Sequence, residues 1–143
     1  TYNPDDFYRT RIERMENLLA EMPLKIRFTI VEWKTLNEGN KIPGVEVWTY
    51  KGELPVSSNT FSSDRRFEKI IEKNGVDYAQ VGVSDEQGLV EINLDRTSLP
   101  QGILFRPGKD SNIKIKYMTM NELMYQAHGT YIEKQFRLKM YVK

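Results

Sequence analysis

The sequence contains no cysteine and a single histidine. Without cysteine, the chain has no disulfide, no thiolate nucleophile and no cysteine-ligated zinc. Its charge is balanced, because 21 lysines and arginines accompany 20 aspartates and glutamates, for a formal net charge of +1. Typical nucleic-acid-binding proteins have a cationic excess, so we expect no nucleic-acid partner. No apolar run approaches the roughly 18 residues of a membrane span.

The composition is that of a globular protein, with 39% hydrophobic and 29% charged residues. A chain of 143 residues has the usual size of one domain and is long enough to bury a core. The sequence begins at Thr1 without a signal-peptide pattern, so we expect a segment of a longer protein. Composition leaves the compartment open, and a bacterial cell envelope or an exported location is the one we prefer.

The first segment of the chain has the pattern of an amphipathic helix. Asp5 and Asp6 suit the positive N-terminal end of a helix, and Pro23 cannot continue one. Apolar residues between them recur at spacings of four and three, which places them on one stripe: Tyr8, Ile12, Met15, Leu19 and Met22. We predict a helix over about residues 5–21 and assign residues 1–23 to an N-terminal helical segment.

This stripe has two interpretations. The spacing is that of a coiled-coil seam, which would make the segment an assembly helix. About two heptads are short for a stable seam, so docking of the stripe on the chain's own sheet is the interpretation that we prefer. Under either interpretation the five apolar side chains require a cover.

Beyond residue 23 the apolar period changes from four and three to two, as in half-buried strands. Ile26, Phe28 and Ile30 share one face of the first such run, and residues 130–143 form the longest run. Residues 76–83 and 89–94 are expected to form a hairpin. Seven strand candidates separated by Gly, Pro and Asn turns predict a mainly β (α+β) fold for residues 24–143: a seven-stranded antiparallel β-sandwich. A small closed barrel of lipocalin type is the structural alternative.

One short helix is expected as an insertion in this sandwich. Ser62 or Ser63 is a suitable N-cap, and the apolar face that follows consists of Phe67, Ile70 and Ile71. The stretch from Thr119 to His128 is compatible with either a helical turn or an irregular edge.

Three short motifs resemble a known family. They are Ile-Pro-Gly-Val-Glu-Val at residues 42–47, Val-Ser-Asp-Glu-Gln-Gly-Leu-Val at residues 83–90, and Leu-Pro-Gln-Gly at residues 99–102. This stretch, about residues 42–106, resembles the carboxypeptidase-regulatory-like and transthyretin-like β-sandwich modules. The resemblance implies an accessory, structural or binding domain within a larger protein. The expected helix around Phe67 departs from the compact module.

The residues suited to catalysis or metal binding lack the settings that such chemistry needs. His128 is the one histidine that could act as a general base, but the chain has no Gly-x-Ser-x-Gly nucleophile elbow whose serine it would activate. Asp85, Glu86 and Asp95 offer oxygen ligands for a hard ion such as calcium, but the twelve-residue calcium loop is missing. A glycosidase would need two acids held across a cleft, which sequence alone does not reveal. We therefore predict no catalytic, cofactor-binding or metal residues.

Two aromatic residues are candidates for binding. Trp48 and Tyr50 share one face of the strand that begins at Val45, opposite Val45 and Val47. If exposed, the two rings would suit stacking on a sugar or gripping a partner. The interpretation that we prefer is that one of the two expected helices covers them.

These observations predict a non-catalytic interaction or assembly module of a larger protein, of the kind found in a bacterial envelope or secretion machine. A protein partner or self-association is expected, without a cofactor. The alternative is a carbohydrate-binding β-domain that uses Trp48 and Tyr50, and an enzyme is the third choice.

Overall fold

A computed structural model describes residues 3–52, 59–61, 78–108 and 110–143, and for residues 19–21 and 59–61 it describes the backbone only. The fold is mainly β, with two sheets and two helices in these residues. The short helix expected around Phe67, Ile70 and Ile71 lies outside the described residues. No described helix is long and apolar enough to cross a membrane.

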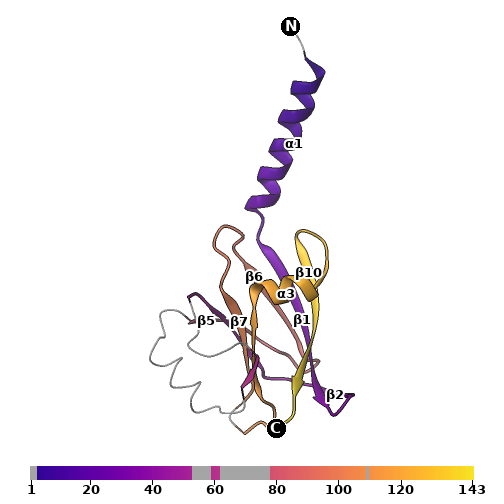
Figure 1. The fold of residues 1–143 in the computed structure, drawn as a ribbon, viewed down its shortest axis with the longest axis vertical. Helices are drawn as coiled ribbons and strands as arrows, with labels where there is room; N and C mark the ends of the chain where they lie inside the picture. Colours follow the sequence, from indigo (N-terminus) through magenta and orange to yellow (C-terminus); the bar gives the residue numbers. More distant parts are fainter. Residues whose placement is uncertain (1–2, 53–58, 62–77, 109) are drawn as a thin grey trace.

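Helix α1, Pro4–Glu21, begins and ends at residues with clear physical causes. The Asn3 side chain caps it, because Asn3 Oδ1 accepts a hydrogen bond from the Asp5 N–H at 3.0 Å. Pro4 takes the first helical position, where a missing N–H has no cost. The helix stops before Pro23, which confirms the expected helix. Figure 1 shows α1 projecting from the β body along the long axis of the molecule.

Each of the two sheets has five strands. The first contains β1 (Leu24–Lys34), β2 (Asn37–Lys41), β6 (Leu89–Leu94), β9 (His128–Gly129) and β10 (Glu133–Tyr141), in the order β2-β1-β10-β9 with β6 also on β1. The second contains β3 (Glu46–Tyr50), β4 (Asn59–Phe61), β5 (Tyr78–Val83), β7 (Gly102–Arg106) and β8 (Ile115–Thr119), in the order β4-β8-β7-β3-β5. Helix α3, Met120–Gln126, is capped by Thr119 and resolves the ambiguous stretch as a helix.

The expectation of seven strands, all antiparallel, is only partly correct. Strands β1 and β10 run parallel, in register from Lys25 beside Glu133 to Trp33 beside Tyr141. Alternation within a strand does not encode the direction of its neighbour, and a parallel neighbour requires a long connection. Here the segment that connects β1 to β10 comprises most of the domain. The extra strands are short, and β2 is exposed at all five positions, so they have no apolar alternation.

The expected hairpin of residues 76–83 and 89–94 is wrong in its pairing. β5 pairs with β3 in the second sheet, whereas β6 pairs with β1 in the first. The connecting turn is present, with Gly88 at φ +70° and its N–H donating to the Asp85 carbonyl at 2.9 Å. This turn therefore crosses between sheets. A register shift at Val47 and Trp48 interrupts the alternation of β5, and its residues Ala79 and Val83 are exposed.

The main core lies between the two sheets. The Phe28 ring on β1 meets the Phe105 ring of the other sheet edge-on, with centroids 5.1 Å apart, and the Phe136 ring at 6.1 Å. The face that contains Ile26, Phe28 and Ile30 is buried, as are Leu24 before it and the alternating apolar residues Val90, Ile92, Leu94, Phe136, Leu138 and Met140. Ile132 and Val142, which share the alternation of the last strand, are half-buried. Side chains from both sheets contribute to this one core, so the sheets face each other across it.

Candidate interaction surface

The apolar stripe of α1 is exposed to solvent. The exposed fractions are 61% for Tyr8, 55% for Ile12, 56% for Met15 and 46% for Met22. The preferred expectation, that this stripe docks on the chain's own sheet, is therefore wrong for these residues. The fifth residue of the stripe, Leu19, is described by its backbone only.

The junction between α1 and β1 explains why the helix points outward. Only Met22 and Pro23 separate the two elements. The Arg96 side chain, which stacks over the Tyr131 ring at 4.0 Å, donates from Nε to the Met22 carbonyl oxygen at 3.0 Å. The chain is thereby held to the β body at Met22, and α1 continues away from it (Figure 1). The inner face of the sheet that follows is already covered by the other sheet.

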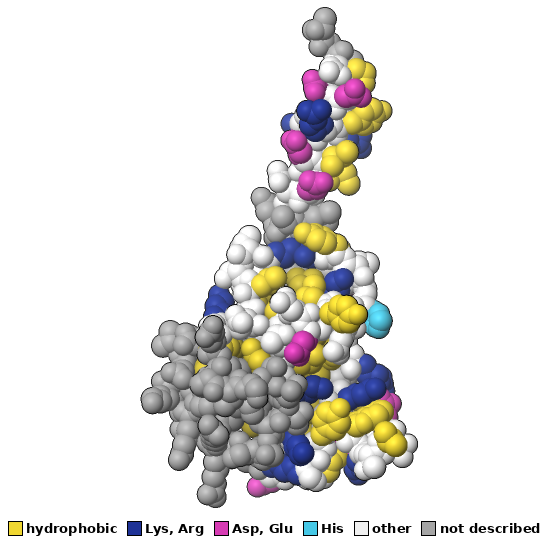
Figure 2. All heavy atoms as spheres, viewed as in Figure 1, with side chains coloured by type: hydrophobic (Ala, Val, Ile, Leu, Met, Phe, Trp, Pro, Cys, Tyr) yellow, Lys and Arg dark blue, Asp and Glu magenta, His cyan; other side chains and the backbone are white. Residues whose placement is uncertain are grey.

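The exposed face of α1 is wider than the sequence stripe suggested. Leu18 is 63% exposed and Phe7 49% exposed, and both flank the stripe. The two are eleven residues apart, which is close to three helical turns. Their spacing in the sequence therefore indicates that they lie on the same side of the helix. Figure 2 shows the apolar side chains along one side of α1 and charged side chains beside them. We call Tyr8, Ile12, Met15, Leu18 and Met22 the α1 face.

Charges flank the seam in a complementary order. With Ile12 at heptad position a and Met15 at d, Arg11 takes position g and Glu16 takes position e five residues later. In a parallel pair of such helices, a g residue lies beside the e residue of the following heptad on the partner helix. Two copies of α1 side by side would thus place Arg11 of each beside Glu16 of the other.

Trp48 and Tyr50 do not form an open platform. Tyr50 is only 5% exposed and lies in an aromatic cluster on the outer side of the second sheet, with its ring 4.6 Å from that of Tyr78. Trp48 is partly buried beside this cluster, and its Nε1–H donates to Glu46 Oε1 at 3.1 Å. The alternative in which the Tyr50 ring is exposed is therefore wrong, and the preferred alternative, a covered ring, agrees with its burial. Of the two suggested covers, α1 is not the one, and the helix around Phe67 lies outside the described residues.

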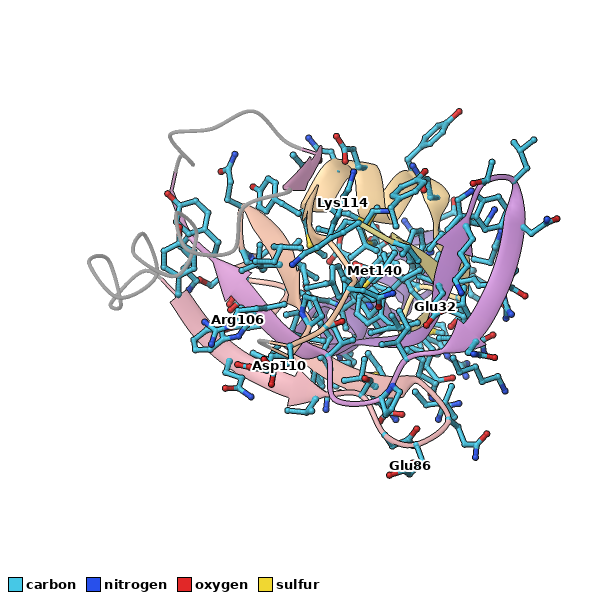
Figure 3. All side chains as sticks on the ribbon, turned by 90° about the horizontal axis from the view of Figure 1, so that it is seen from below. Glu32, Glu86, Arg106, Asp110, Lys114 and Met140 are labelled. Carbon is cyan, nitrogen blue, oxygen red and sulfur yellow. The ribbon has the colours of Figure 1, made fainter. Side chains whose placement is uncertain are left out.

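The acids that seemed available for a metal are engaged in turns. Asp85 Oδ1 accepts from the backbone N–H groups of Gln87 and Leu89. Asp95 Oδ1 accepts from the Thr97 hydroxyl and N–H, which lowers the pKa of Asp95. Figure 3 shows Glu86 at the tip of an outer loop. Within the described ranges, no three His, Asp or Glu side chains gather as a metal site would require.

His128 lies exposed on the short edge strand β9, with Gln135 as its register partner. This is a surface position on a sheet edge.

Comparison of the chain with protein-family models, curated proteins and solved structures finds no match. The resemblance of residues 42–106 to transthyretin-like modules therefore stays a prediction.

Proposed function

We propose that the chain is a non-catalytic assembly module of a larger protein, and that two copies associate through α1 as a parallel two-stranded coiled coil. The observation that carries this proposal is the α1 face, whose five large apolar side chains are 46–63% exposed on a helix that projects from the body.

The physical reason is the cost of leaving this face in water. Full burial of a large apolar side chain is worth about 1.5–3 kcal/mol, so even the exposed half of each is a substantial driving force for association. Most of the stability of a helix in a protein comes from packing of its apolar face, and the apolar face of this 18-residue helix is exposed. A partner helix supplies both the missing cover and the missing stability.

The identity of the partner follows from the heptad pattern. Arg11 and Glu16 are oppositely charged and spaced to meet across a parallel pair of identical helices. Ile12 is a β-branched residue at position a, a residue type that suits this position in parallel two-stranded coiled coils. Because α1 projects beyond the body, a second helix can lie along most of its length.

Sedimentation velocity over about a hundredfold range of protein concentration tests the proposal, since dimerisation depends on mass action. We expect a dimer at the upper end of the range. A variant with both Ile12→Asp and Met15→Asp should be a monomer throughout, because the seam would then bury charges. Asn17→Asp, at position f on the opposite side of the helix, is the control and should dimerise normally. A wild-type chain that stays monomeric at every concentration would contradict the proposal.

A carbohydrate-binding role has weaker support. It requires two exposed rings on one strand, and Tyr50 is buried. We therefore propose no second function for this face.

A further inference from the structure

The sulfur atoms of this chain belong to six methionines, since it has no cysteine. Two of the six, Met15 and Met22, lie on the α1 face and are 56% and 46% exposed. Met124 on α3 is half-buried. The other three are at most 7% exposed in the core of the β body, where Figure 3 labels Met140: Met118, Met120 and Met140. The two most exposed methionines are therefore both on the α1 face.

These two methionines occupy equivalent places in the heptad pattern. With Ile12 at position a and Met15 at position d, Met22 follows seven residues later and takes the next d position. In a two-stranded coiled coil, each d side chain inserts into a hole between side chains of the facing helix and loses its contact with water. Two associated copies of α1 would thus cover the thioethers of both helices, and dissociation would expose them again.

Oxidation converts a thioether from an apolar group into a polar one. A peroxide transfers one oxygen atom to the sulfur: a sulfur lone pair attacks the peroxide, the O–O bond breaks and an S=O bond forms. The sulfur is oxidised by two electrons, and hydrogen peroxide is reduced to water. The sulfoxide oxygen is an acceptor of hydrogen bonds, and the apolar side chains of Ile12 and Leu18 carry no donor for it. Burial of such an unpaired oxygen opposes association.

We propose that the α1 face is a redox-sensitive switch: a peroxide oxidises Met15 and Met22 of the dissociated chain, and the sulfoxides prevent dimerisation. This inference rests on the proposed function, because it concerns the same seam. The β body keeps its fold under the same conditions, since its core methionines are buried. A thiol reductant acting through a methionine sulfoxide reductase reverses the switch, because two thiols supply the two electrons and the oxygen leaves as water.

Sedimentation velocity of the full chain before and after treatment with hydrogen peroxide is the main test. Peptide mass spectrometry locates the added oxygen, and we expect it at Met15 and Met22 before any at Met140. The oxidised chain should dimerise at least about tenfold more weakly, because each copy brings two unpaired polar groups to the seam. Reduction by methionine sulfoxide reductase should restore the original affinity.

Two negative outcomes of this test have different meanings. An untreated chain that is monomeric at every concentration overturns the proposed function, and this inference with it. An untreated dimer that keeps its affinity after oxidation of Met15 and Met22 overturns this inference alone.

The rate of oxidation gives a second measurement. The rates at Met15 and Met22 should fall as the protein concentration rises through the range of dimerisation, because the seam then covers both sulfur atoms. Met124, on α3 and outside the seam, is the internal control, and its rate should not depend on protein concentration. A Met15 rate that is the same in monomer and dimer would contradict its burial at position d.

Matched leucine variants separate the switch from general oxidative damage. A variant with both Met15→Leu and Met22→Leu has no thioether on α1 and carries the residue type that suits position d. It should dimerise equally well before and after peroxide. Met124→Leu is the control and should lose its dimer after treatment, as the unaltered chain does. Loss of the dimer in the double leucine variant would overturn the proposal, and circular dichroism confirms that each oxidised chain is folded.

Discussion

Two apolar stripes follow each other directly in this chain and lie in opposite environments. On β1, Leu24, Ile26, Phe28 and Ile30 are at most 1% exposed, whereas every described residue of the α1 face is at least 46% exposed. Both stripes are regular and equally easy to see in the sequence. The difference is that β1 has β6 and β10 beside it and the second sheet opposite, while α1 projects past the body (Figure 1).

Periodicity identifies which side chains share a face, but it does not identify what covers that face. The cover of β1 comes from segments far along the chain, such as the strand containing Phe105. For α1 the described chain offers no such segment, so its face is the place where another molecule is expected.

The largest difference in the free energy of unfolding is expected when one phenylalanine on β1 and one on α1 are each replaced by alanine. Phe28→Ala should lower the free energy of unfolding by about 3–5 kcal/mol, because it leaves a cavity beside Phe105 and Phe136. Phe7→Ala, on α1 and 49% exposed, should change it by less than about 1 kcal/mol. Urea unfolding at a concentration where the chain is monomeric measures both. Similar losses for the two variants would mean that α1 belongs to the core.

Deleting residues 1–21 tests whether the β body needs α1. We expect self-association to disappear while the free energy of unfolding of the monomer changes by less than about 1 kcal/mol, since surface segments contribute little. Sedimentation and urea unfolding of the shortened chain measure the two quantities. A shortened chain that no longer folds would show that α1 stabilises the body.

A charge exchange on α1 is expected to have a moderate effect and to define the orientation of the two helices. Arg11→Glu places like charges beside Glu16 in a parallel pair and should weaken the dimer by about 1 kcal/mol for the two symmetric contacts. Adding Glu16→Arg to this variant should restore the affinity. Sedimentation equilibrium measures both constants, and a double variant weaker than the single one would rule out the parallel arrangement.

The smallest effect concerns a surface ion pair that crosses β1. Arg137 on β10 donates from Nη2 to Glu38 Oε2 on β2 at 2.7 Å, and this hydrogen bond lowers the pKa of Glu38. A carboxyl whose pKa is lower in the folded state stabilises the fold above its unfolded pKa, and that contribution is lost as the pH falls through its folded pKa. Glu38→Gln should therefore lower the melting temperature slightly at neutral pH and have no effect in strong acid. High salt should reduce the difference, because exposed charges are screened, and a difference that grows towards acid would contradict this assignment.

Several parts of the fold were readable from local pattern. The alternation in β1, β6 and β10 correctly identified the buried faces, and Pro23 marked the end of α1. Strand β2 was missed because its side chains are exposed and its turn gives no glycine signal: Thr35 and Leu36 have positive φ angles of 29° and 73°. The cover of Tyr50 was not identified from the sequence, because alternation separates two faces without showing what covers either one.

The candidate sites divide in the same way. The α1 face was visible in the sequence, since one continuous helix contains all of its residues. The neighbourhood of Trp33 and Tyr141 was not, because these two residues meet only through the parallel pairing of the first and last strands. By itself the sequence determined the elements with regular periods, since helix and strand geometry place side chains at fixed spacings. The tertiary structure alone decided which strands are neighbours, which way they run and which faces are covered, since these depend on contacts between distant segments.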